Sequence, residues 1–143
     1  DIMEAVSRLY VALLQAALAV MAFIVVPDHA VSGENVSVEV DDYAFCKSVE
    51  NREPINRERS FSSDVGRVYL WTLITGAEEP VKIKHVWYYG DKRMNKVKLE
   101  IPYERTRTWS YKTILPSQTG DWYVDIIDCD GNLLKQVSFE VNE

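Results

Sequence analysis

The side chains that most often carry catalysis or bind metals are few in this chain and stand far apart. The two histidines are His29 and His85, and no H-x-x-x-H or C-x-x-C spacing occurs. The chain also lacks a G-x-S-x-G sequence, a phosphate-binding glycine loop and a dinucleotide-binding fingerprint. We therefore predict a protein that is not an enzyme, with no catalytic residues, no metal ligands and no cofactor.

Three acidic residues near one predicted turn are the best alternative metal site. Asp125, Asp128 and Asp130 could attract a cation such as calcium. However, Asp125 falls within a predicted strand, and no flanking Glu completes a known calcium loop. The sequence therefore predicts no metal site here.

His85 alternates with Ile83 and Trp87, which indicates that it packs in the core or at its rim. The two cysteines, Cys46 and Cys129, both fall near predicted strand ends. In a domain outside the cytoplasm they could form a disulfide, and two isolated buried thiols are an equal alternative.

Basic side chains cluster in one predicted hairpin. Lys82 and Lys84 share a face of one strand, and Lys96 and Lys98 share a face of the next. Lys92 and Arg93 lie in the turn between them. This candidate interaction face could meet acidic lipid headgroups, an acidic partner subunit or an anionic glycan. The alternative is a solvated face whose charges keep an edge strand from aggregating.

Aromatic residues are spread through the predicted strands, about one tryptophan to a strand. Large buried rings fill the centre of a sandwich, so we expect most of these to be core. Exposed rings would instead form a platform for sugars or an interface anchor. The residues concerned are Trp71, Trp87, Trp109 and Trp122, with Tyr88, Tyr89 and Tyr111 as better candidates for the surface.

An apolar run from Leu9 to Val26, interrupted only by Gln15, precedes these strands. As a helix it would be about 27 Å long, near the roughly 30 Å of a bilayer core. Its length and the lack of a small-x-small cleavage site favour a membrane anchor or an assembly-buried helix over a signal peptide. The side chains that we expect to pack against lipid or other subunits are Leu9, Leu13, Gln15, Ala16, Ala19 and Phe23.

The flanks of this run predict its orientation. Arg8 precedes the run, and the next basic residue is Lys47. Because basic residues are enriched on the cytoplasmic side, the C-terminal part should lie outside the cytoplasm, in the periplasm or at the cell surface. We predict three parts: residues 1–27 as the helix, 28–35 as a tether and 36–143 as a β domain.

The β domain is predicted from alternating apolar residues. Seven strands are expected, which predicts a mainly β fold: an immunoglobulin-like antiparallel β-sandwich preceded by one hydrophobic α-helix. Residues 50–64 are polar and contain Pro54, so we expect a surface loop there. The strands are expected at residues 36–40 (continuing through 43–46), 65–75, 81–89, 94–101, 107–115, 121–128 and 133–141.

Several short strings resemble a known bacterial family. They include E-N-R-E-P at residues 50–54, H-V-W-Y-Y-G at 85–90, W-S-Y-K-T at 109–113 and T-G-D-W at 119–122. Together they resemble the domain of unknown function 2914 over about residues 38–142. The resemblance implies a small β-rich domain, often attached to membrane segments, and no established activity.

The functional expectation is a binding role at a membrane. We predict an accessory or structural subunit of a larger membrane-associated assembly, with lipid and other protein subunits as partners of the helix, as a homo- or hetero-oligomer. The net charge of −6 gives no indication of nucleic-acid binding. The alternatives are a pilin-like subunit, with its apolar helix and Glu4 in a filament core, and a glycan-binding module.

Overall fold

The regular structure from Val38 onward consists of strands. The computed structural model describes Ile2 and residues 38–143. Residues 38–143 contain no helix, and nowhere in the described residues is a helix long and apolar enough to cross a membrane. The predicted helix, with Leu9, Leu13, Gln15, Ala16, Ala19 and Phe23, and the predicted tether lie outside the described residues.

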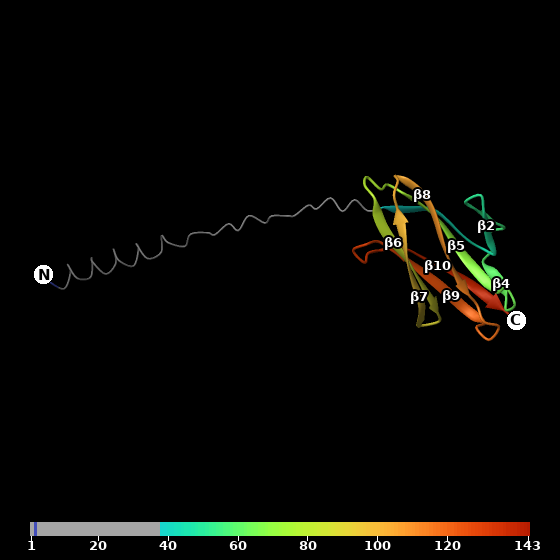
Figure 1. Ribbon diagram of the computed structural model, residues 1–143. Coiled ribbons are helices and arrows are strands. Elements are labelled where there is room, and N and C mark those ends of the chain that lie inside the picture. Colours follow the sequence, from blue (N-terminus) through green and yellow to red (C-terminus); the bar gives the residue numbers. More distant parts are fainter. Residues whose placement is uncertain (1, 3–37) are drawn as a thin grey trace. The chain divides into compact units, whose positions relative to one another are not determined.

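Two sheets make up most of the domain (Figure 1). The three-stranded sheet has the order β1 (Glu39–Cys46), β5 (Arg67–Thr75), β8 (Arg105–Thr113), and its pairs are antiparallel. The five-stranded sheet has the order β4 (Ser60–Ser62), β10 (Leu133–Asn142), β9 (Gly120–Ile127), β6 (Val81–Tyr89), β7 (Lys92–Ile101). In this sheet β4 runs parallel to β10 and the other pairs are antiparallel.

The main core lies between the two sheets and is centred on Phe139. The Phe139 ring on β10 meets Phe45 of β1 at 4.7 Å between ring centroids, Trp122 of β9 at 5.9 Å and Trp87 of β6 at 6.1 Å. These rings share one buried cluster with Leu70 of β5. The alternation of the strands therefore directs apolar side chains from both sheets into one layer, as in a sandwich.

The seven predicted strands are confirmed, with small shifts at their ends, and the region between the first two was predicted wrongly. Residues 50–64 are not only a loop, because they include β3 (Glu53–Ile55) and β4 and contain the end of β2 (Ser48–Glu50). β2 and β3 form a separate hairpin, and β4 adds the parallel pair. The domain thus has ten strands and mixed sheets rather than seven antiparallel strands.

The β2–β3 hairpin covers the outer face of the three-stranded sheet. Its turn places Asn51 and Arg52 at positive φ, 50° and 64°, a two-residue turn whose twist matches antiparallel strands. Trp71 Nε1 of β5 donates a hydrogen bond to the Arg52 carbonyl oxygen at 2.9 Å. Trp71 is buried with Ala44 and Leu73 in a second, smaller cluster. A polar segment is held in place here by a tertiary contact with a tryptophan.

Candidate interaction surface

The basic hairpin of the sequence analysis is the β6–β7 pair. The chain reverses at Gly90, whose φ of 53° is favourable for glycine, and Asp91. Along β6, Ile83, His85 and Trp87 are buried, while Lys82 is exposed and Lys84 half-buried. The alternation therefore points the apolar side chains into the core and the lysines to the outer face of the five-stranded sheet.

The strand register brings four of the six predicted cations onto this outer face. Lys84 lies directly opposite Lys98, and Val86 lies directly opposite Lys96. Lys82 lies opposite Glu100. Lys92 and Arg93 occupy the start of β7, opposite Tyr89 and Tyr88. We call Lys82, Lys84, Lys92, Arg93, Lys96 and Lys98 the basic face.

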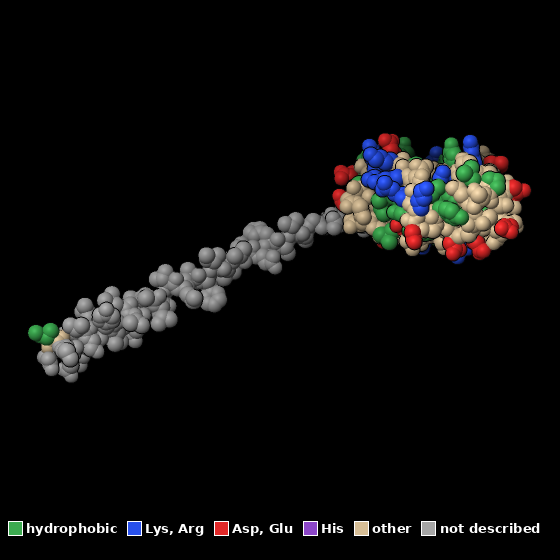
Figure 2. Space-filling model, turned by 90° about the horizontal axis from the view of Figure 1, so that it is seen from below, with side chains coloured by type: hydrophobic (Ala, Val, Ile, Leu, Met, Phe, Trp, Pro, Cys, Tyr) green, Lys and Arg blue, Asp and Glu red, His purple; other side chains and the backbone are tan. Residues whose placement is uncertain are grey.

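The cations of the basic face have no salt-bridge partner within residues 38–143. The ion pairs found there involve other basic residues: Lys47 with Glu58, Arg57 with Asp42, Arg105 with Asp41, and Arg107 with Glu53. Figure 2 shows Lys and Arg side chains gathered in one region of the surface that it presents. Like charges directly opposite each other, such as Lys84 and Lys98, destabilise a sheet.

A tyrosine pair lies beside the basic face. Tyr88 of β6 is opposite Tyr123 of β9, and their rings stack at 4.6 Å with an interplanar angle of 8°. Both are half-buried. Val86 points to the same outer face but is only 4% exposed, because long neighbouring side chains cover it with their aliphatic parts. Tyr88 was expected at the surface from the sequence, whereas Tyr123 was not, although its alternation with Trp122 and Val124 could have indicated it.

His85 belongs to a buried hydrogen-bond chain that joins both sheets. Trp87 Nε1 donates to Ser110 Oγ at 3.0 Å, and Ser110 Oγ lies 2.7 Å from His85 Nδ1. His85 Nε2 lies 3.3 Å from Thr72 Oγ1, which donates to the Thr108 carbonyl oxygen at 2.9 Å. Since the Thr72 hydroxyl proton is already used, His85 Nε2 must carry the ring proton and Nδ1 must accept from Ser110.

Burial keeps His85 neutral, and this direction of donation suits the neutral ring. In this arrangement Ser110 Oγ donates to His85 Nδ1, so a proton added to Nδ1 would meet the hydroxyl proton of Ser110. The ring is also fully buried. Burial lowers the pKa of His85 from 6.5 to about 3. His85 is thus the core histidine predicted from its alternation, with both ring nitrogens partnered.

The disulfide that the sequence left open beside two isolated thiols is absent from the structure. Both cysteines are free, with Cys46 buried and Cys129 exposed. Cys129 lines a hollow of about 820 Å³ together with Val38 and Val40, at the start of β1, whereas Cys46 ends that strand. The strand from Val40 to Cys46 spans about 20 Å, while bridged cysteines have Cα atoms less than about 7 Å apart. The two cysteines thus lie toward opposite ends of β1, in agreement with two free thiols.

Two of the three acidic residues near the β9–β10 turn accept hydrogen bonds from neighbouring residues. Asp128 Oδ1 accepts from the amides of Asp130 and Asn132 at 2.9 and 2.8 Å. Asp125 Oδ1 accepts from Gln136 Nε2 at 2.8 Å. Among the residues that the structure describes, no group of three His, Cys, Asp or Glu side chains could hold a metal ion.

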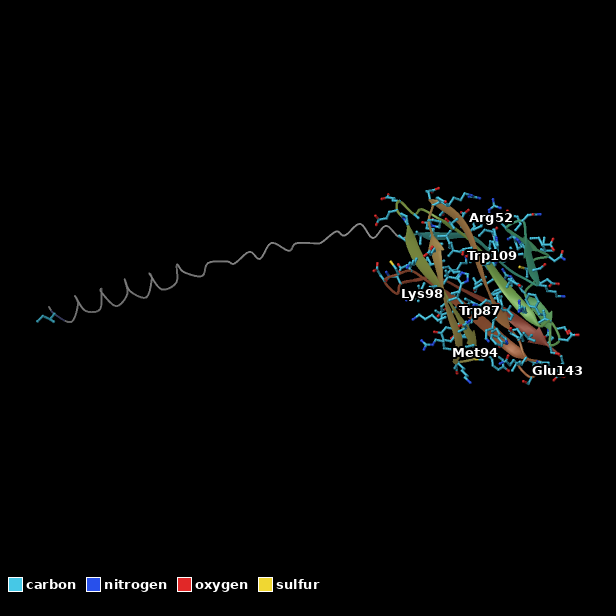
Figure 3. All side chains as sticks on the ribbon, in the orientation of Figure 1. Arg52, Trp87, Met94, Lys98, Trp109 and Glu143 are labelled. Carbon is cyan, nitrogen blue, oxygen red and sulfur yellow. The ribbon has the colours of Figure 1, made fainter. Side chains whose placement is uncertain are left out.

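The tryptophans are mainly core, as expected. Trp71, Trp87 and Trp122 are buried, and Trp109 is half-buried under Arg52. The Arg52 guanidinium lies 5.8 Å from the Trp109 ring centroid, and Figure 3 shows the two side chains together. Of the three tyrosines proposed for the surface, Tyr111 is 45% exposed, while Tyr88 and Tyr89 are half-buried.

Comparison with known proteins gives one family. Residues 80–141 match the family described as "Protein of unknown function (DUF2914)", and the curated proteins contain no match. The matched residues run from the start of β6 almost to the end of β10 and include the whole basic face. The expected resemblance to this family is therefore confirmed for β6 to β10.

Proposed function

We propose that this chain is a non-enzymatic accessory or structural subunit of a larger membrane-associated assembly. Residues 1–27 tether it to the membrane and to other subunits. The β domain lies outside the cytoplasm, in the periplasm or at the cell surface, and binds an acidic surface of a partner subunit through the basic face.

One observation supports this role above the others. The basic face contains six cations without ion-pair partners in the described part of the chain, and Lys84 and Lys98 stand directly opposite each other. This arrangement destabilises the folded sheet. We therefore infer that the charges serve binding. An acidic partner would relieve the repulsion and would also speed association.

The fold proposed for this role is immunoglobulin-like. The chain crosses between the sheets from β5 to β6, from β7 to β8 and from β8 to β9. Such crossings are typical of Greek-key sandwiches, in which sheet faces and loops serve binding. The glycan-binding alternative has less support, because three of the four tryptophans are buried and cannot stack on sugars. The pilin-like alternative depends on residues 1–27.

Photocrosslinking in native membranes tests the proposal. One variant carries a photoreactive amino acid at position 15 of the apolar run, and a second carries it at position 84 of the basic face. We expect protein adducts from both positions. Adducts with lipid alone from position 15 would contradict the assembly role, and sheared filaments in the same preparation would favour the pilin-like alternative.

A charge reversal tests the acidic partner. Lys98→Glu should reduce the protein adduct from position 84, because it turns attraction into repulsion. Lys47→Glu is the matched control, since it makes the same charge change outside the basic face, where Lys47 lies 4.0 Å from Glu58. An equal loss in both variants would mean that net charge, and not this surface, controls binding.

A further inference from the structure

The open edge of β7 is the least protected strand edge in the domain. β7 ends the five-stranded sheet, and β6 is its only neighbour. The edges of β1 and β8 are met by other parts of the chain: Glu58 N donates to the Phe45 carbonyl oxygen at 2.9 Å, and Arg52 Nη2 donates to the Arg107 carbonyl oxygen at 3.2 Å. The other edge strands, β2, β3 and β4, have three residues each, whereas β7 has ten.

The register shows which backbone groups of β7 face this edge. Gly90 N donates to the Asp121 carbonyl oxygen at 3.0 Å, so even-numbered residues of β6 bond to β9. Odd-numbered residues of β6 must then bond to β7, and they lie opposite odd-numbered residues of β7. The backbone groups of Lys96, Lys98 and Glu100 therefore point outward. The Lys96 amide confirms this direction, since it donates to Asn95 Oδ1 at 2.9 Å.

The two faces of β7 present different chemistry. On the inner face, Met94, Val97 and Leu99 pack against the core but stay only partly buried, so apolar side chains from another strand could cover them. On the outer face, Lys96 and Lys98 are exposed and lack ion pairs within residues 38–143. Figure 3 labels Met94 and Lys98, which lie toward opposite ends of β7.

We propose that β7 accepts an extended segment of the partner protein as an additional antiparallel strand. This inference rests on the proposed function and specifies its partner: the segment alternates acidic and apolar residues. Its acidic side chains lie opposite Lys96 and Lys98, and its apolar side chains cover Met94, Val97 and Leu99. Backbone hydrogen bonds to Lys96, Lys98 and Glu100 supply affinity, and the alternation supplies specificity.

The first test uses a short blocked peptide of alternating valine and glutamate with the full chain in detergent micelles. Residues opposite Lys96 and Lys98 share their face and direct their own backbone groups toward β7. N-methylation of the glutamates should therefore abolish binding, whereas N-methylation of the valines should leave it intact. Bound peptide should also slow amide hydrogen exchange at Lys96 and Lys98. The reverse methylation pattern, or unchanged exchange, would overturn strand addition.

The second test reverses the charge of β7. The double variant Lys96→Glu, Lys98→Glu should bind this peptide about tenfold more weakly and should prefer a peptide of alternating valine and lysine. The double variant Lys47→Glu, Arg67→Glu carries the same charge change at two exposed positions outside the basic face and should keep the original preference. Equal effects of the two variants would overturn the proposed register. Displacement of the peptide by phosphatidylglycerol vesicles would overturn the proposal in favour of an anionic lipid surface.

The two proposals can fail separately. Protein adducts from position 84 together with no peptide binding would leave the subunit role in place and remove strand addition. Lipid adducts alone would remove the subunit role, whatever the peptide does.

Discussion

At the scale of single residues, His85 shows how a polar side chain can be fully buried with both ring nitrogens hydrogen-bonded. Its two ring nitrogens meet Ser110 and Thr72, and each of these hydroxyls has a further partner. In the described residues no buried side-chain nitrogen or oxygen lacks a hydrogen bond. Fully satisfied networks of this kind favour one arrangement of the core. The alternation of His85 with Ile83 and Trp87 predicts its burial but not its partners.

The stability of the domain should depend on pH through His85. Below about pH 6.5 the unfolded chain binds a proton on this ring, but the folded chain does not until about pH 3. The free energy of unfolding should therefore fall as the pH falls through this range, by about 1.4 kcal/mol for each pH unit. Urea denaturation of the full chain at several pH values between about 7 and about 4.5 measures this slope.

A glutamine at this position removes the titration. His85→Gln should lower the free energy of unfolding near neutral pH by about 1–3 kcal/mol, because Ser110 and Thr72 lose a partner. It should also flatten the pH dependence. An unchanged slope in His85→Gln would show that other groups cause the pH dependence.

At the scale of elements, the β2–β3 hairpin is where the sequence prediction failed most clearly. Short polar strands without an alternating apolar pattern resemble a loop, and Pro54 supports that reading. A two-stranded hairpin is only marginally stable alone. The hairpin depends on contacts that are distant in sequence, above all that of Trp71 with the Arg52 carbonyl oxygen.

We expect Trp71→Phe to loosen this hairpin. The variant removes the donor to the Arg52 carbonyl oxygen, and we expect the free energy of unfolding to fall by about 1–3 kcal/mol. Amide hydrogen exchange within residues 48–55 should become faster than in the rest of the domain. Exchange followed by mass spectrometry measures both regions together.

The ion pair between Glu53 and Arg107 provides the matched control. It is short, 2.6 Å, but both side chains are at least 40% exposed. Exposed pairs contribute less than about 1 kcal/mol, so Glu53→Gln should change the exchange of the hairpin little. A larger effect of Glu53→Gln than of Trp71→Phe would show that charge, rather than the tryptophan, holds the hairpin.

At the scale of the whole molecule, the two cysteines lie toward opposite ends of β1, and this makes them chemically different. Cys129 is exposed, whereas burial raises the pKa of the Cys46 thiol. Alkylation of the folded chain should therefore modify Cys129 quickly and Cys46 only after unfolding. Intact-mass spectrometry should give the same result with and without prior reduction. A label that appears only after reduction would indicate a disulfide.

What the sequence determined by itself is local. Strand positions, the turn at Gly90 and the lysine side of the β6–β7 hairpin follow from alternation and turn residues within a few positions of one another. This is why all seven predicted strands are found, and why the basic face was predicted as a set.

Only the tertiary structure decided how these pieces meet. It placed β7 at a sheet edge, set Lys84 opposite Lys98, covered Trp71 with a polar hairpin and separated Cys46 from Cys129 along β1. Each of these results depends on pairing between segments far apart in the chain. The stable pairing is the one that buries the apolar side chains of all strands in one core. No single segment of the sequence contains that information.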